Sequence, residues 1–144
     1  MSCQIDQSGQ SLRVCFTADT AFYRFGPPKG EPDLEISQPL GFLDYQPWPG
    51  VGRSIFETVV FSNEGYDYTV FAGFDRMFGD ETEKDHPSPR FGGVTVTRGE
   101  EELAALTCSR QTVDFAWGEG LFEAKQNLGY VWDFDSRSWI ALPD

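Results

Sequence analysis

The chain has 144 residues, with 23 acidic and 11 basic side chains and a formal net charge of −12. Its 13 Phe, 5 Tyr and 4 Trp can build the core of one domain, and we expect residues 1–144 to form a single β domain. The charge argues against nucleic-acid binding, because phosphates are neutralised by a basic surface. No apolar run approaches the roughly 18 residues of a membrane-spanning helix, so we expect no transmembrane segment.

The three cysteines allow at most one disulfide and leave at least one thiol. Cys3 and Cys15 flank a turn at residues 8–10, and a hairpin in which they face each other predicts a Cys3–Cys15 disulfide. The alternatives are a Cys15–Cys108 disulfide, which would join distant strands, and three reduced thiols in a cytosolic protein. We favour a periplasmic or secreted protein whose export signal is absent from this sequence.

Turn residues recur at short intervals, and the segments between them are rich in β-branched and aromatic residues, as in antiparallel sheets. In chain order, strands are predicted over residues 11–16, 21–25, 33–37, 54–61, 66–74, 93–97, 103–108, 131–133 and 138–142. The clearest hairpin joins residues 54–61 to 66–74, because Tyr66, Tyr68 and Val70 alternate with other side chains at the period of a strand.

The loop over residues 45–53 contains rigid prolines together with Trp48 and Arg53. Trp and Arg are enriched at protein-binding hot spots, so we predict a partner-binding surface at this loop. A structural interpretation is also open, in which Trp48 folds back to close one end of a barrel and Arg53 pairs with a carboxylate.

An acidic segment follows the predicted strand 66–74. Five carboxylates fall within eleven residues: Asp75, Asp80, Glu81, Glu83 and Asp85. Hard cations bind such oxygen ligands, so calcium is a candidate cofactor here, although the spacing does not follow the EF-hand pattern. The alternative is a solvated acidic loop, and we expect no other cofactor.

A catalytic constellation is not evident in the sequence. The single histidine, His86, lies in a polar, proline-containing loop without apolar neighbours that would shift its pKa. There is no nucleophile elbow, phosphate-binding glycine loop or His-x-x-x-His metal pair, and we therefore expect a protein that is not an enzyme.

One helix is predicted, over residues 120–128. Four of its side chains share a face at helical spacing: Leu121, Phe122, Lys125 and Leu128. Gly129 suits the left-handed residue that ends a helix, and we expect the Lys125 ammonium to stay in water. The whole pattern predicts a mainly β fold, an antiparallel meander closing into a small β-barrel or sandwich with one short helix near the C-terminus.

Two stretches carry a resemblance to small exported bacterial β proteins of unassigned function: Ser54-Ile55-Phe56-Glu57 leading to Asn63-Glu64-Gly65-Tyr66-Asp67-Tyr68-Thr69-Val70, and Gly92-Gly93-Val94-Thr95-Val96 followed by Leu103-Ala104-Ala105-Leu106-Thr107-Cys108. In layout the chain is similar to the periplasmic and membrane-bound inhibitors of C-type lysozyme. This resemblance implies a compact eight-stranded barrel, often with a disulfide, that inserts a Ser-Gly-x-x-Tyr-like loop into the lysozyme cleft. Ser62, Gly65 and Tyr68 correspond to that loop, but Asn63 follows Ser62 where the family has Gly, and the lysine often found in the loop is absent.

The leading hypothesis is therefore an exported, non-enzymatic protein that recognises a macromolecular partner, such as a cationic lysozyme-like enzyme. Its expected contact residues are Trp48, Arg53, Ser62, Gly65 and Tyr68. The alternative is a small-ligand or calcium-binding β-barrel. A polysaccharide-active enzyme with two facing carboxylates is the third hypothesis.

Overall fold

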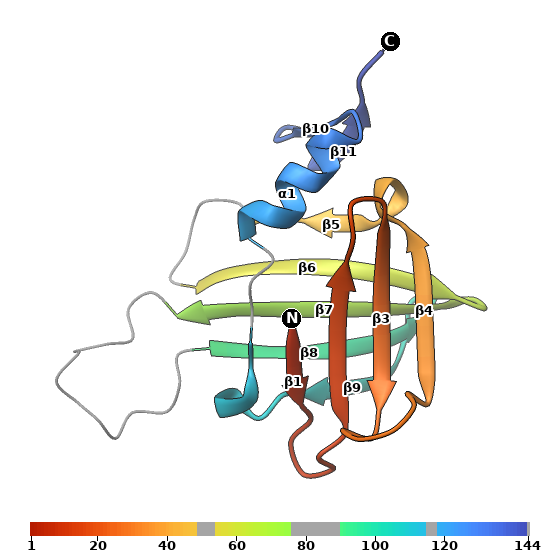
Figure 1. Cartoon of the computed structure of the whole chain (residues 1–144), viewed down its shortest axis with the longest axis vertical. Helices are drawn as coiled ribbons and strands as arrows, with labels where there is room; N and C mark the ends of the chain where they lie inside the picture. Colours follow the sequence, from red (N-terminus) through yellow and green to blue (C-terminus); the bar gives the residue numbers. More distant parts are fainter. Residues whose placement is uncertain (49–53, 76–89, 115–117, 144) are drawn as a thin grey trace, which may run out of the picture.

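A computed structural model describes residues 1–48, 54–75, 90–114 and 118–143 (Figure 1). Two antiparallel sheets and a short C-terminal hairpin make up its strands. The first sheet has the order β1-β2-β3-β4: Ser2–Gln4, Ser11–Phe16, Thr20–Gly26 and Leu34–Pro39. The second has the order β5-β6-β7-β8-β9: Asp44–Gln46, Ser54–Asn63, Tyr66–Asp75, Arg90–Arg98 and Glu101–Thr107.

The two sheets are consecutive parts of the chain. Within each sheet every strand pairs with its neighbour in sequence, and the short helix η1 (Leu40–Phe42) connects β4 of the first sheet to β5 of the second. Their strands cross steeply, with the first sheet lying against one face of the second (Figure 1). The mainly β fold is thus confirmed as a sandwich, and the sheets do not close into a barrel. All nine predicted strands are present, with ends that differ by at most three residues.

The core lies between the sheets, where inward side chains alternate with outward ones. Tyr23 of the first sheet packs on Phe61 and Tyr68 of the second, with ring centroids 5.7 and 5.2 Å apart. Tyr45 of β5 is fully buried as well, and aliphatic side chains fill much of the remaining core: Leu12, Val59, Val70, Ala72 and Val94. The aromatic and β-branched residues of the sequence therefore form the contact between the two sheets.

The C-terminal part consists of α1 (Gly118–Asn127) and the hairpin of β10 (Tyr130–Asp133) and β11 (Ser138–Ala141), which lie beside the edge strand β5 (Figure 1). The predicted helix is present, and Gly129 follows it with a φ of +93°. Leu121 is buried, but Leu128 is 40% exposed and lies outside the packed face. Within the described part of the chain, no helix is long and apolar enough to cross a bilayer.

The expectation that the Lys125 ammonium stays in water is wrong. The side chain is fully buried, and its Nζ donates hydrogen bonds to the carbonyl oxygens of Leu40 and Leu43 at 2.9 Å and of Gly41 at 3.2 Å. The Leu40 carbonyl also accepts the backbone N–H of Leu43 within the tight η1 turn at 3.2 Å, and the Lys125 ammonium adds a donor for all three carbonyls.

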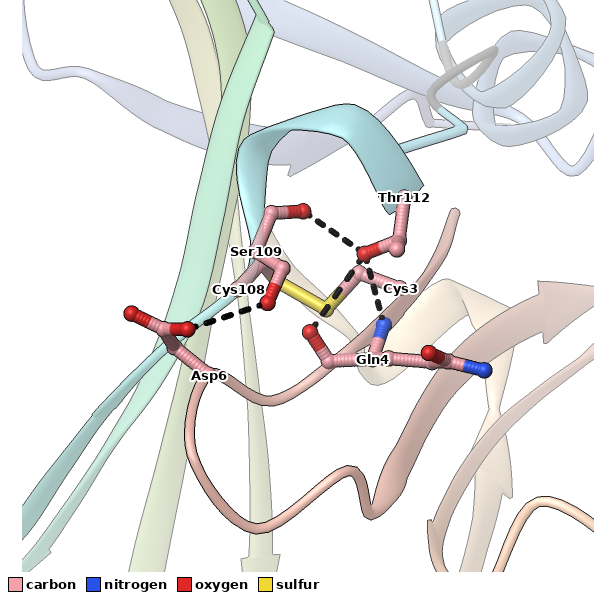
Figure 2. The surroundings of a disulfide bond; sticks show 6 residues. All are labelled: Cys3, Gln4, Asp6, Cys108, Ser109 and Thr112. Atoms are coloured by element: carbon pink, nitrogen blue, oxygen red, sulfur yellow. Dashed lines mark hydrogen bonds between the residues drawn. A yellow bond between two sulfur atoms is a disulfide. The ribbon is translucent and has the colours of Figure 1, made fainter.

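The disulfide joins Cys3 to Cys108, so both predicted pairings, Cys3–Cys15 and Cys15–Cys108, are wrong (Figure 2). In the β1–β2 register Cys3 lies opposite Leu12 rather than Cys15. Leu12 and Val14 occupy the inward face of β2, and Cys15 is consequently an exposed free thiol on the outward face.

Cys108 reaches Cys3 because the end of β9 runs beside the start of the chain, with a bridge between Ile5 and Cys108. Thr112 holds this junction together. Its Oγ1 accepts a hydrogen bond from the backbone N–H of Gln4 at 2.9 Å and donates one to the backbone carbonyl of Ser109 at 2.6 Å (Figure 2). The disulfide thus links the first sheet to the second.

Candidate ligand-binding groove

An open groove of about 450 Å³ lies at the end of the sandwich near α1. Its lining is mostly apolar and comes from four parts of the chain: Tyr45 with Pro47 and Trp48 after it, Ile55 and Glu57 of β6, Phe122 of α1, and Phe134 after β10. Tyr45 pairs with Val59, which places Glu57 at the diagonal position on the same inward face. The meander therefore brings an acid and a phenol together at the groove.

Glu57 and Tyr45 form the polar centre of this groove. The Tyr45 hydroxyl donates a 2.6 Å hydrogen bond to Glu57 Oε1. Tyr45 is 0% exposed and Glu57 is 8% exposed. Burial, together with this hydrogen bond and the charge of Glu57, raises the pKa of Tyr45. The phenol therefore stays protonated near neutral pH and holds the carboxylate in one orientation.

Trp139 holds Tyr45 in place through a hydrogen bond and a stacking contact. Its Nε1 donates to the Tyr45 carbonyl oxygen at 2.8 Å, and its ring stacks on Tyr45 with centroids 6.1 Å apart. Phe122 meets the same indole edge-on at 5.0 Å, and Trp132 packs on it at 5.4 Å. This aromatic cluster joins the hairpin and α1 to the edge of the second sheet, so the groove wall is held by packing on several sides.

Lys125 lies behind the same cluster. Its Nζ is 5.3 Å from the Trp139 ring centroid and 5.4 Å from that of Tyr130, which stabilises the ammonium through cation–π contacts. Burial nevertheless lowers the Lys125 pKa to about 8, while the charge of Asp44 opposes that shift. The lysine supports the groove without contacting its interior.

The predicted contact residues do not gather at one place. Trp48 lines the groove, and Arg53 lies outside the described residues. Ser62 lies five residues along β6 from Glu57, roughly 17 Å at about 3.3 Å per residue, and Gly65 follows in the turn after β6. Tyr68 packs on Tyr23 between the sheets, while the Ser62 hydroxyl donates to Asp67 at 2.6 Å.

Of the calcium candidates, the structure describes Asp75 alone. Its carboxylate accepts a 2.7 Å hydrogen bond from Ser54 and lies 3.7 Å from Arg110. Four further candidates and the only histidine lie outside the described residues: Asp80, Glu81, Glu83, Asp85 and His86. In the described ranges no group of three or more His, Cys, Asp or Glu side chains could hold a metal ion.

Sequence reasoning missed Glu57 as a functional residue, although a signal for it exists. In the predicted strand 54–61, alternation puts Glu57 on the same face as Ile55, Val59 and Phe61. A glutamate at an inward position needs polar partners, because burying an unpaired carboxylate is very unfavourable. Phe122 and Phe134 carry no comparable signal, since their approach to Glu57 depends on how α1 and the hairpin dock.

No protein-family model matches the chain, and comparison with curated proteins and with solved structures also finds no match.

Proposed function

We propose that this protein is a non-catalytic binding protein that holds a small organic amine in the groove around Glu57. The observation that carries the proposal is an oriented, nearly buried carboxylate at an aromatic and apolar wall. Small-molecule sites commonly combine such a wall with a few fixed polar groups, and the groove volume suits a ligand of one or two rings.

The preference for an amine follows from the chemistry of the lining. The Tyr45 hydroxyl donates to Glu57 Oε1, and an oriented carboxylate with about four lone-pair sites is the kind of acceptor that an ammonium ligand requires. The rings of Trp48, Phe122 and Phe134 present π faces that attract cations and pack on apolar groups. The net charge of −12 draws cations towards the protein as a whole.

The lining also supports a binding role over catalysis. Among the described residues of the lining Glu57 is the single carboxylate, whereas glycoside hydrolysis by the usual mechanism needs two facing acids. Tyr45 is a poor base, because its proton is held by the hydrogen bond to Glu57 and its pKa is raised. These two features support a ligand-binding protein over the polysaccharide-active alternative.

The binding test compares three probes of similar size: phenethylamine, phenethyl alcohol and phenylpropionate. Isothermal titration should show the amine binding about tenfold more tightly than the alcohol, which corresponds to about 1.4 kcal/mol, and the carboxylate should bind most weakly. Glu57→Gln should abolish the preference for the amine. Glu31→Gln removes an equal charge at an exposed loop position and should leave the preference intact.

If wild-type protein binds neither the amine nor the alcohol, the ligand-binding proposal is wrong. If both bind equally and Glu57→Gln changes nothing, the groove binds apolar ligands and the assignment to amines fails. Thermal melting of each variant checks that the fold is retained.

The lysozyme-inhibitor interpretation is the second candidate function, because Ser62 at the exposed end of β6 lies close to Gly65 in the exposed turn between β6 and β7. Attraction to a cationic enzyme would speed association at low salt. Full activity of cationic C-type lysozymes in the presence of a micromolar excess of this protein would exclude it.

An exported location is part of the same proposal. The Cys3–Cys108 disulfide supports it, since disulfides persist in the periplasm and outside the cell and are rare in a reducing cytosol.

A further inference from the structure

The described strands of the second sheet carry no charged side chain at the centre of their outward surface. We call this surface the outer face and define it as the outward-pointing residues within 56–60, 69–73, 91–97 and 103–107. Strand register and burial place threonine, phenylalanine, valine, alanine, leucine and glycine at these positions. Among the residues that the structure describes, outward carboxylates of this sheet lie around the outer face, at Asp67, Asp75 and Glu102 near strand ends and at Asp44 on the edge strand.

Two glycines keep the outer face flat. A Cβ atom at Gly73 would lie 2.7 Å from the Phe56 Cα, and one at Gly93 would lie 2.9 Å from the Phe71 ring. The Phe71 ring therefore lies over the Gly93 backbone, which carries no side chain, and it packs on Phe91 with ring centroids 6.5 Å apart. Phe56 lies opposite Gly73, so outward aromatic side chains come from three neighbouring strands, β6, β7 and β8.

This face is open to solvent, as Phe56 is 40% exposed and Leu103 is 47% exposed. The solvated side of an antiparallel sheet usually carries polar and charged residues. An uncharged, partly aromatic face on a chain with a net charge of −12 instead marks an interaction surface.

We propose that the outer face binds a second copy of this chain and forms a symmetric dimer. In a twofold contact the same patch meets itself, so a carboxylate near the twofold axis would lie close to the same carboxylate of the other copy. A cationic partner would impose no such condition and would be bound better by a face that kept its acids. The confinement of acids to the rim is therefore the charge pattern that self-association requires.

The size of the face sets the expected strength of the dimer. Four strands about 4.8 Å apart and roughly six residues long at about 3.3 Å per residue cover roughly 400 Å². Two copies would bury roughly 800 Å² at the centre, against about 1,600 Å² in a standard interface. We therefore expect a weak, reversible dimer that is strengthened by salt, since salt screens the repulsion between two anionic copies.

Sedimentation equilibrium of the full chain tests this proposal at concentrations up to about 1 mM, the upper end of weak affinities. The wild type should show a monomer–dimer equilibrium that shifts towards dimer with added salt. Thr95→Asp places a charge at the centre of the face, opposite Thr69 and Ala105, and should weaken dimerisation at least tenfold. Ser37→Asp adds the same charge at an exposed position of the first sheet and should not weaken it.

Hydroxyl-radical labelling of the wild type provides a test that does not depend on any variant folding. Labelling of Phe56 should fall as protein concentration rises, while that of Phe42, which is 78% exposed on η1, should stay constant. A protein that stays monomeric at every concentration overturns the proposal, and the outer face would then bind a different partner. Equal effects of Thr95→Asp and Ser37→Asp, with both variants folded, overturn it as well.

Discussion

The Lys125 ammonium donates a 2.9 Å hydrogen bond to the carbonyl oxygen of Leu40, and this contact connects α1 to the turn between the two sheets. A buried cation requires several partners to offset its lost hydration. Lys125 has three carbonyl acceptors and two aromatic rings around it. The lysine therefore holds the C-terminal part, and with it the Phe122 wall of the groove, in place.

Replacing this lysine with an apolar side chain of similar length should destabilise the protein. In Lys125→Met the carbonyls of Leu40, Gly41 and Leu43 lose the hydrogen bonds from the ammonium, although that of Leu40 keeps the Leu43 backbone N–H, and we expect a loss of about 1–3 kcal/mol. Lys29→Met makes the same exchange at an exposed site and should change stability by less than about 0.5 kcal/mol. Urea unfolding measures the free energy of unfolding of both variants. Equal stabilities of Lys125→Met and Lys29→Met would contradict the supporting role of Lys125.

The same lysine should make stability depend on pH. Its pKa is lowered to about 8 in the folded protein from 10.5, so between these values the unfolded chain holds a proton that the folded protein has released. Stability should therefore rise with pH across this window, by up to about 3 kcal/mol. The Lys125→Met variant should lack this rise, and the difference between the two unfolding curves at each pH isolates the lysine. Parallel curves would contradict the lowered pKa.

The strands were predictable because alternation and turn residues act locally. The hairpin over residues 54–61 and 66–74 forms with the expected partners, and Gly65 takes the positive φ of +85° that its turn requires. The N-terminal hairpin shows where local reasoning fails, since its register was predicted from the cysteines. Burial of Leu12 and Val14 decides the register instead, and it turns Cys15 outward.

The groove could be predicted only in part. Trp48 was identified from its residue type, and Glu57 could have been found from strand alternation. Phe122 was expected on the packed face of the helix, but no local pattern tells which edge that helix will cover. The burial of Lys125 could not be predicted for the same reason, because its acceptors are carbonyls more than eighty residues away in sequence.

Removing the disulfide should destabilise the fold strongly. The Cys3–Cys108 bond closes a loop with a sequence separation of 105, and loops of this length correspond to about 2–5 kcal/mol of stability. The double variant Cys3→Ser with Cys108→Ser should show this loss in urea unfolding, and Cys15→Ser should not. Alkylation of the unreduced wild type should modify Cys15 alone. Alkylation of all three cysteines would contradict the assigned bond.

The hydrogen bond between Tyr45 and Glu57 should contribute to both stability and ligand preference. Tyr45→Phe keeps the ring but removes the donor from a nearly buried carboxylate, and we expect a loss of about 1–3 kcal/mol. Tyr66→Phe, at a partly exposed end of β7, serves as the control and should change stability by less than about 0.5 kcal/mol. In the folded Tyr45→Phe protein the Glu57 carboxylate loses its fixed orientation, so the preference for phenethylamine over phenethyl alcohol should shrink. A variant that keeps wild-type stability and preference would show that this hydrogen bond does not organise the groove.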